Sequence, residues 1–251
     1  MIFYFTSTGN SLYAAEKIAG ATKERLVSIG QALKEDLYEY DITDEEYLGF
    51  IVPTFAWTLP GAVGLFLERL ILTGYVNQFV YGVFTCGGST GFESAALYSM
   101  LKTKSIAFNG SFDLVMPDNF IIWSNVPPLF QIDAMLDKAD RQLGGIIASI
   151  KTKIPGKVDT SPPKELYMKL TEVSTSKNTS KLYADDRCTA CGLCMDICPM
   201  GCIKTDNKGR PLWEGICTMC LACLHRCPEN AVQHGSDTQN KGRYVNPRVR
   251  F

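Results

Sequence analysis

Residues 188–199 read CTACGLCMDICP, and residues 217–228 read CTMCLACLHRCP. Both stretches have the spacing C-x-x-C-x-x-C-x-x-x-C-P, and the second follows the first by 29 residues. A repeat of this kind predicts one structural unit that is used twice. Soft thiolates are the ligands that iron–sulfur clusters prefer. Three cysteines at intervals of three allow one tight loop to hold three corners of a cube, and the fourth cysteine is expected to point away from that loop.

A pair of zinc sites is the alternative interpretation, because zinc is also bound by cysteine. Structural zinc usually takes four ligands in two C-x-x-C pairs, whereas each repeat here adds a third cysteine three residues further on. The spacing therefore favours iron–sulfur clusters. Cys202 stands outside the repeated pattern, aligned with Ala231, and is expected to be a small buried side chain.

Residues 181–235 resemble the bacterial two-cluster ferredoxins, in which the fourth cysteine of each run binds the other cluster. The resemblance implies two [4Fe–4S] clusters whose ligands cross between the repeats. The first cluster would take Cys188, Cys191, Cys194 and Cys227, and the second would take Cys198, Cys217, Cys220 and Cys223. A chain that holds two such clusters is expected to move single electrons.

The first 150 residues alternate strand-like and helix-like segments. Strands are predicted at 1–5, 26–29, 48–53, 79–85 and 106–116, and helices at 10–21, 59–72, 91–104 and near 131–152. The continuous apolar run at 48–53 is typical of a strand that is buried on both faces. This alternation predicts an α/β doubly wound parallel sheet, with a ligand beyond the carboxyl ends of its strands.

The first predicted strand leads into a short polar loop before a helix. The loop consists of Thr6, Ser7, Thr8, Gly9, Asn10 and Ser11. Hydroxyls, a glycine and free backbone N–H groups at a helix N-terminus suit a phosphate, although an ordinary capped helix is the alternative. Dinucleotide and P-loop fingerprints are absent. The loop resembles the FMN-phosphate loop of flavodoxins, T/S-x-T-G-N-S/T, and this resemblance implies that FMN is a cofactor.

Two further loops follow strands of the predicted sheet. They contain Pro53, Thr54, Phe55, Ala56 and Trp57 in one case, and Thr85, Cys86, Gly87 and Gly88 in the other. In flavodoxins the corresponding loops flank the flavin ring, so Trp57 is the candidate for stacking on it, with a core aromatic as the alternative. No Lys, Arg or His flanks Cys86, which is expected to be a wall residue rather than a redox thiol. The loop at 117–130 either covers the flavin, contacts the cysteine-rich part, or packs as an ordinary apolar loop.

The whole chain resembles the family of flavodoxin–ferredoxin fusion proteins. We expect a flavodoxin-like FMN-binding domain at 1–150, a linker with a short helix near 164–172 at 151–180, and a small α+β two-cluster ferredoxin-like domain at 181–251. Residues 1–150 carry 9 Lys and Arg against 16 Asp and Glu, whereas residues 151–251 carry 16 against 10. The two halves can therefore attract each other. No dense basic stripe predicts binding to nucleic acid.

No secretory leader and no apolar run long enough for a membrane span are recognisable, and the cysteines have metal-site spacing. We therefore expect a cytoplasmic protein. The predicted function is an electron-transfer protein that couples FMN to two [4Fe–4S] clusters, as a relay between one-electron and two-electron steps. The alternatives are an FMN-dependent reductase of a small substrate that is fed by its own clusters, and an interaction protein without flavin. The expected partners are redox proteins, and both their identity and the oligomeric state are left open.

Overall fold

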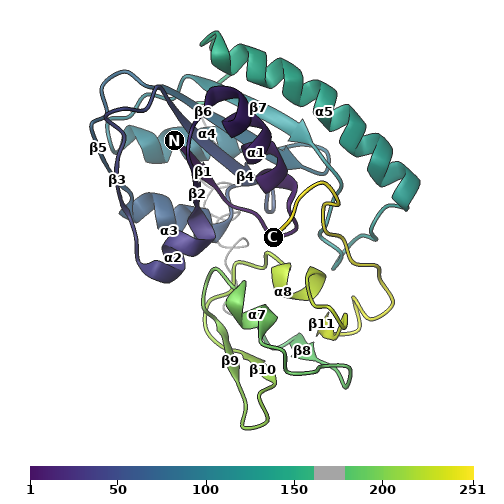
Figure 1. Ribbon diagram of the computed structural model, residues 1–251. Coiled ribbons are helices and arrows are strands. Elements are labelled where there is room, and N and C mark those ends of the chain that lie inside the picture. Colours follow the sequence, from purple (N-terminus) through teal and green to yellow (C-terminus); the bar gives the residue numbers. More distant parts are fainter. Residues whose placement is uncertain (161–178) are drawn as a thin grey trace.

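The computed structural model describes residues 1–160 and 179–251 (Figure 1). Residues 1–151 build an α/β domain, and residues 179–251 build a small cysteine-rich domain against one edge of it. The last residues of the chain return to the α/β domain, where the C-terminus lies near the start of α1 in Figure 1. The helix expected near 164–172 lies outside the described residues, and the expected domain boundaries stay a prediction.

The α/β domain is built on a five-stranded parallel sheet with the order β2-β1-β4-β6-β7. This is the flavodoxin-like order 2-1-3-4-5 when only the strands of this sheet are numbered. The predicted fold class is therefore confirmed. The strands are β1 (Ile2–Tyr4), β2 (Leu26–Ser28), β4 (Tyr47–Pro53), β6 (Phe79–Cys86) and β7 (Gly110–Val115).

Helices cover both faces of this sheet. They are α1 (Asn10–Thr22), α2 (Ile29–Glu35), α3 (Gly61–Arg69), α4 (Glu93–Lys102) and α5 (Leu129–Lys151). Ile51 of β4 packs with α1 and α5, whereas its neighbours Phe50 and Val52 pack with the other three helices. The two cores explain why β4 reads as a continuous apolar run. Within residues 1–160 and 179–251, no helix is long and apolar enough to cross a membrane.

The structure corrects the sequence interpretation in three places. Helix α2 was not expected; Ser28 begins it by accepting a hydrogen bond from the backbone N–H of Gln31 at 3.3 Å. The helix predicted at 59–72 ends at Arg69, because β5 (Ile71–Thr73) pairs in parallel with β3 (Glu39–Asp41). The strand predicted at 106–116 begins only at Gly110. Helix α2 has seven residues and strands β3 and β5 have three each, so hydrophobic periodicity marks them weakly.

The cysteine-rich domain repeats one structural unit. Its elements are β8 (Leu182–Ala184), α7 (Leu193–Asp196), β9 (Ile203–Thr205), β10 (Pro211–Trp213), α8 (Ala222–His225) and β11 (Val232–His234). A shift of 29 residues places β8 on β10, α7 on α8 and β9 on β11. The strands pair antiparallel, β8 with β11 and β9 with β10. The sequence repeat is therefore a repeat of structure, as predicted.

The loop at 117–130 contacts the cysteine-rich domain, which is one of the alternatives that the sequence left open. Ile121 is fully buried in an apolar cluster with Leu221 and Leu224. The Lys241 ammonium donates to the carbonyl oxygen of Ile121 at 2.8 Å. Hydrogen bonds and apolar packing together join this loop to the second domain.

Gly49 of β4 provides a test of the packing between the central strands. A β-carbon at this position would lie 2.5 Å from the hydroxyl oxygen of Tyr81, which is fully buried. We expect Gly49→Ala to lower the free energy of unfolding by about 1–3 kcal/mol, because the core has no room for the methyl group. Gly144 in α5 meets open space, and Gly144→Ala is expected to raise it by about 0.5–1 kcal/mol. Anaerobic urea unfolding measures the free energy of unfolding of both variants. The same change in Gly49→Ala as in Gly144→Ala would contradict the packing argument.

Candidate cofactor sites

A polar cavity opens at the carboxyl ends of the central strands. It brings together the three loops that the sequence singled out, and it adds a fourth from 117–119. Its lining residues are Thr6, Ser7, Thr8, Asn10, Ser11, Pro53, Thr54, Phe55, Thr85, Cys86, Gly87, Pro117, Asp118 and Asn119. The sequence offered the 117–130 loop as a possible cover of the flavin, but it did not single out Pro117, Asp118 and Asn119 as site residues, because no motif marks them.

The loop before α1 is shaped by its one glycine. Gly9 has a φ of 101°, a conformation that side chains disfavour, and α1 begins at the next residue. Its backbone N–H donates to the Thr6 hydroxyl oxygen at 3.0 Å. The Ser11 and Thr85 hydroxyl oxygens lie 2.8 Å apart. Gly9 lines neither of the two cavities at this edge, and its positive φ turns the chain into α1.

Asn10 lines the polar cavity, but its side-chain amide is engaged within the protein. The amide nitrogen donates to the carbonyl oxygen of Pro117 at 3.0 Å. The amide oxygen accepts from the Tyr244 hydroxyl at 2.6 Å and from the Asn246 amide at 3.1 Å. Tyr244 and Asn246 belong to the C-terminal tail, which sequence reasoning did not place near this site. A ligand would therefore meet Asn10 chiefly through its backbone N–H in the first turn of α1.

A second and larger cavity of about 700 Å³ lies between the two domains. The α/β domain contributes the loops after β4 and β6 and the 118–124 segment, and the cysteine-rich domain contributes the other wall. The lining residues are Thr54, Phe55, Ala56, Trp57, Gly87, Gly88, Ser89, Asp118, Asn119, Phe120, Ile122, Trp123, Ser124, Thr218, Met219, Cys220 and His234. Trp57 is 51% exposed, so its alternative as a core aromatic is wrong.

Trp57 sits in a tight turn that is built without glycine. Phe55 and Thr58 exchange backbone hydrogen bonds of 3.0 and 3.1 Å, and the two residues between them, Ala56 and Trp57, have φ values of 49° and 61°. Such a two-residue loop usually contains glycine or asparagine. Gly91 packs against it, since a β-carbon there would lie 2.6 Å from the β-carbon of Trp57. The neighbouring loop thus holds a strained turn in place, as is common at binding sites.

A buried carboxyl group lies under this turn. Glu93 is fully buried, and neither of its oxygens has a hydrogen-bond partner among the described residues. Burial raises its pKa to about 8, and the charge of Asp113 adds to the rise. Burial also raises the pKa of the Cys86 thiol to about 11, which fits a wall residue rather than a redox thiol.

The cysteines line two cavities in the cysteine-rich domain. One is lined by Cys188, Cys191, Cys194 and Cys227. The other is lined by Cys198, Cys202, Cys217, Cys220 and Cys223. Cys227 of the second repeat thus lies with the first group, and Cys198 of the first repeat lies with the second group. This grouping is the one that the resemblance implies, and the ligand assignment itself stays a prediction. Cys202 is buried as expected, but its sulfur lies 3.6 Å from that of Cys198 and faces the same cavity.

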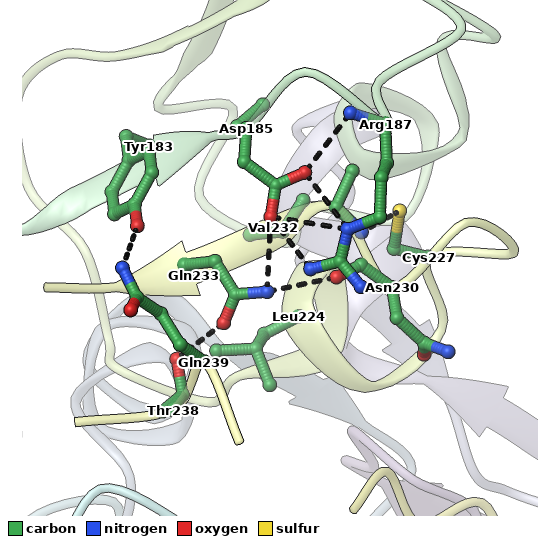
Figure 2. A network of polar contacts seen from close by, with 12 residues as sticks. Tyr183, Asp185, Arg187, Leu224, Cys227, Asn230, Val232, Gln233, Thr238 and Gln239 are labelled. Atoms are coloured by element: carbon green, nitrogen blue, oxygen red, sulfur yellow. Dashed lines mark hydrogen bonds and ion pairs between the residues drawn. The ribbon is translucent and has the colours of Figure 1, made fainter. Parts of the chain in front are cut away.

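Polar contacts fix the backbone around the first cysteine cavity (Figure 2). The Asp185 carboxylate accepts hydrogen bonds from the Arg187 guanidinium, the closest at 2.6 Å. The Gln233 amide donates to the carbonyl oxygen of Asn230 at 2.9 Å and to Asp185 at 3.4 Å. The network joins the ends of the strand pair β8 and β11 to the loop that carries Cys227.

One family model matches part of the chain. Residues 175–232 match the model of the 4Fe-4S dicluster domain. The match supports an iron–sulfur electron-transfer role. No curated protein matches the chain.

Several solved structures share part of the fold at low similarity. A flavodoxin from the domain Archaea has 15% identity and a TM-score of 0.37, and covers 60% of this chain and 97% of its own. The Trp repressor binding protein of Bacillus subtilis has 15% identity and a TM-score of 0.36, with 57% and 97% covered. Rubredoxin oxygen:oxidoreductase of Desulfovibrio gigas has 15% identity and a TM-score of 0.37, with 61% of this chain but only 36% of its own length covered. The flavodoxin-like assignment rests on the strand order instead.

The raised pKa of Glu93 predicts that the free energy of unfolding of the protein depends on pH. Its pKa in the folded protein is about 8, against an ordinary value of 4.5. Between these values the unfolded chain loses the proton and the folded protein keeps it, so the wild type loses stability as the pH rises. Glu93→Gln is expected to be more stable than the wild type at pH 7.5, by about 1 kcal/mol or more, and similar at pH 5. The exposed Glu68→Gln is the control, and a gain that does not grow with pH in anaerobic unfolding would contradict the assignment.

Proposed function

We propose that the chain is an electron-transfer protein in which FMN, held at the carboxyl edge of the sheet, exchanges electrons with two [4Fe–4S] clusters in the cysteine-rich domain. The observation that carries the proposal is the cavity of about 700 Å³, which has Trp57 and Gly87 on one wall and Met219 and Cys220 on the other. A flavin between these walls would lie next to a cluster ligand. The two cofactors would then form one internal relay.

The two cysteine cavities fit iron–sulfur clusters by the chemistry of their donors. Each is lined by at least four thiols in a mainly apolar wall. Backbone N–H groups also point at the sulfurs: Met219 donates to Cys217 at 3.3 Å, and Ala231 donates to Cys227 at 3.4 Å. Hydrogen bonds of this kind tune the potential of a cluster. The clusters would supply single-electron chemistry.

The polar cavity fits the phosphate end of FMN. The Thr6–Ser11 loop offers hydroxyls and the backbone N–H groups of the first turn of α1, where the helix dipole favours an anion. Trp57 and Phe55 give an apolar wall for a ring system in the larger cavity, and the backbone of Gly87 and Gly88 allows close approach. Bound FMN would supply the exchange between one and two electrons, while these residues hold and orient it.

The positions of the three cavities support a sequence for electron transfer, from the first cluster through the second to the flavin. Cys194 of the first group packs in one apolar cluster with Cys198 and Cys223 of the second. Cys220 of the second group also lines the flavin-side cavity. Cys191 of the first group is exposed. A redox protein partner would therefore exchange electrons at the first cluster, and the second cluster would stand between it and the flavin.

A reductase of a small substrate is the second candidate. The cavity between the domains is within the usual size range of ligand pockets, and it continues past the flavin-site loops to Phe120, Trp123 and His234. A flat apolar molecule could lie there over the flavin. Turnover of an organic acceptor at a rate that Trp123→Ala reduces would favour this candidate.

Cluster content is the first test of the proposal. We expect about eight iron and eight sulfide per chain, because both cysteine runs are complete. Cys198→Ala should lose the cluster of the second cavity, whereas Cys202→Ala should keep both clusters. Iron and sulfide analysis with EPR of the reduced protein measures this. If Cys202→Ala loses iron and Cys198→Ala keeps it, Cys202 and not Cys198 is the cluster ligand, and the assignment is wrong.

Flavin identity is the second test. Protein denatured after anaerobic purification should release FMN and no FAD, because the loop offers donors for one terminal phosphate and no pyrophosphate fingerprint is present. Thr8→Ala combined with Ser11→Ala is expected to raise the Kd for FMN by about tenfold or more, since hydrogen bonds to phosphate are strong. The partly exposed Ser149, which lines neither cavity, is the control, and Ser149→Ala should leave the Kd unchanged. Release of FAD, or of no flavin, would exclude the proposed site.

The relay itself predicts a kinetic signature. After reduction of the clusters by a one-electron donor in a rapid-mixing experiment, the flavin should bleach at a rate that does not depend on protein concentration. The physical reason is that the flavin-site loops and Cys220 line one cavity, so the electron need not leave the molecule. A rate that rises in proportion to protein concentration would mean that electrons cross between molecules.

A further inference from the structure

Two hydrogen-bonded connections run from one histidine of the cysteine-rich domain to the phosphate loop. In the first, Nε2 of His225 donates to the carbonyl oxygen of Asn119 at 2.7 Å. The side-chain amide of Asn119 then donates to the Thr8 hydroxyl oxygen at 2.6 Å. The chain of contacts thus reaches from α8 to the loop that begins α1.

The second connection passes through the C-terminal tail. The backbone N–H of Tyr244 donates to Nδ1 of His225 at 3.1 Å, and the Tyr244 hydroxyl donates to the Asn10 amide oxygen at 2.6 Å. Two residues further on, the backbone N–H of Asn246 donates to the carbonyl oxygen of Thr8 at 2.7 Å. Since Nδ1 accepts, Nε2 carries the ring proton, and both ring nitrogens of His225 are in use.

Most of the groups that form the two connections are buried, whereas Asn119 is partly exposed at the cavities that it lines. His225, Tyr244 and Asn246 are exposed by only 3%, 2% and 1%. Breaking one of these contacts would leave a polar group buried without a partner, which costs more than the contact itself contributes. The tail also packs tightly on the loop, because a β-carbon on Gly9 would lie 2.6 Å from a methyl carbon of Val249. The contacts made by His225 and by the tail are therefore closely packed.

We propose that the tail segment 244–246 supports the FMN site from behind by holding Thr8 and Asn10, and that His225 is a positioning residue that couples flavin binding to the second cluster. His225 ends α8, the helix that carries Cys223, so a change at the cluster can reach Thr8 and Asn10 through these contacts. By thermodynamic linkage the coupling is reciprocal. Bound FMN would strengthen binding of the second cluster by the same free energy by which the cluster strengthens binding of FMN. The inference rests on the proposed function, because it takes FMN as the ligand.

Tyr244 and His225 allow a sharp test, because neither lines either flavin-side cavity. FMN is removed from the full chain with both clusters retained, and the Kd is measured by flavin fluorescence. Tyr244→Phe is expected to raise the Kd about five- to tenfold, because the Asn10 amide oxygen loses its closest donor. Tyr183→Phe is the matched control: that hydroxyl accepts from Gln239 at 2.7 Å on the same domain, outside both connections (Figure 2), and its loss should change the Kd less than twofold.

A second variant and a second readout separate transmission from loss of folding. His225→Leu removes both connections and is expected to raise the Kd about tenfold, whereas His225→Gln keeps one donor and should recover part of the affinity. Iron release to a chelator should be slowed by FMN in the wild type and slowed less in Tyr244→Phe. An unchanged Kd in both Tyr244→Phe and His225→Leu, with the wild type binding FMN, would overturn the coupling and leave the proposed function standing. A wild type that binds no FMN would overturn both.

Discussion

The packing of the Thr218–Ala222 loop against the carboxyl edge of the sheet is the contact on which the arrangement of the molecule depends. Helix α3 begins after Pro60, whose side chain cannot cap it, and the Thr218 hydroxyl accepts the backbone N–H of Ala62 at 3.2 Å instead. Cys220 and Ala222 lie in the core of the α/β domain. One domain thus completes a helix end and a core of the other. This keeps the second cysteine cavity beside the flavin-site loops.

The charge difference between the two halves of the chain contributes little to the contact between the domains. The sequence suggests that the net negative first part and the net positive remainder attract each other, and Arg248 of the tail does pair with Asp137 and Asp140 of α5. These pairs are partly exposed, and such pairs usually contribute little. Buried contacts, such as those of Ile121 with Leu224, are the stronger source of attachment. Apolar burial therefore contributes more than these ion pairs to holding the two domains together.

The sequence predicts what local pattern and spacing can encode. The cysteine repeat predicted both halves of the cysteine-rich domain, and the strand–helix alternation predicted the sheet and the edge where its loops meet. The contributions of Asn119, Tyr244 and Asn246 could not be predicted, because each depends on where a distant segment returns in space. The turn at Ala56 and Trp57 was equally hidden, since it adopts a conformation that its residues disfavour and that only the surrounding packing enforces.

The Thr6–Ser11 loop, which we propose to bind the phosphate of FMN, has no positive charge of its own, and this gives the tail its importance. Residues 6–11 contain no Lys or Arg, and the nearby Arg248 is occupied by the α5 carboxylates. Binding of a phosphate would then depend on neutral donors and on the dipole of α1, which act only at short range and in the right orientation. A lysine tolerates small displacements of a phosphate, whereas a set of N–H groups does not. Contacts that hold Thr8 and Asn10 in place would therefore set the affinity, even though they lie behind the site and never touch the ligand.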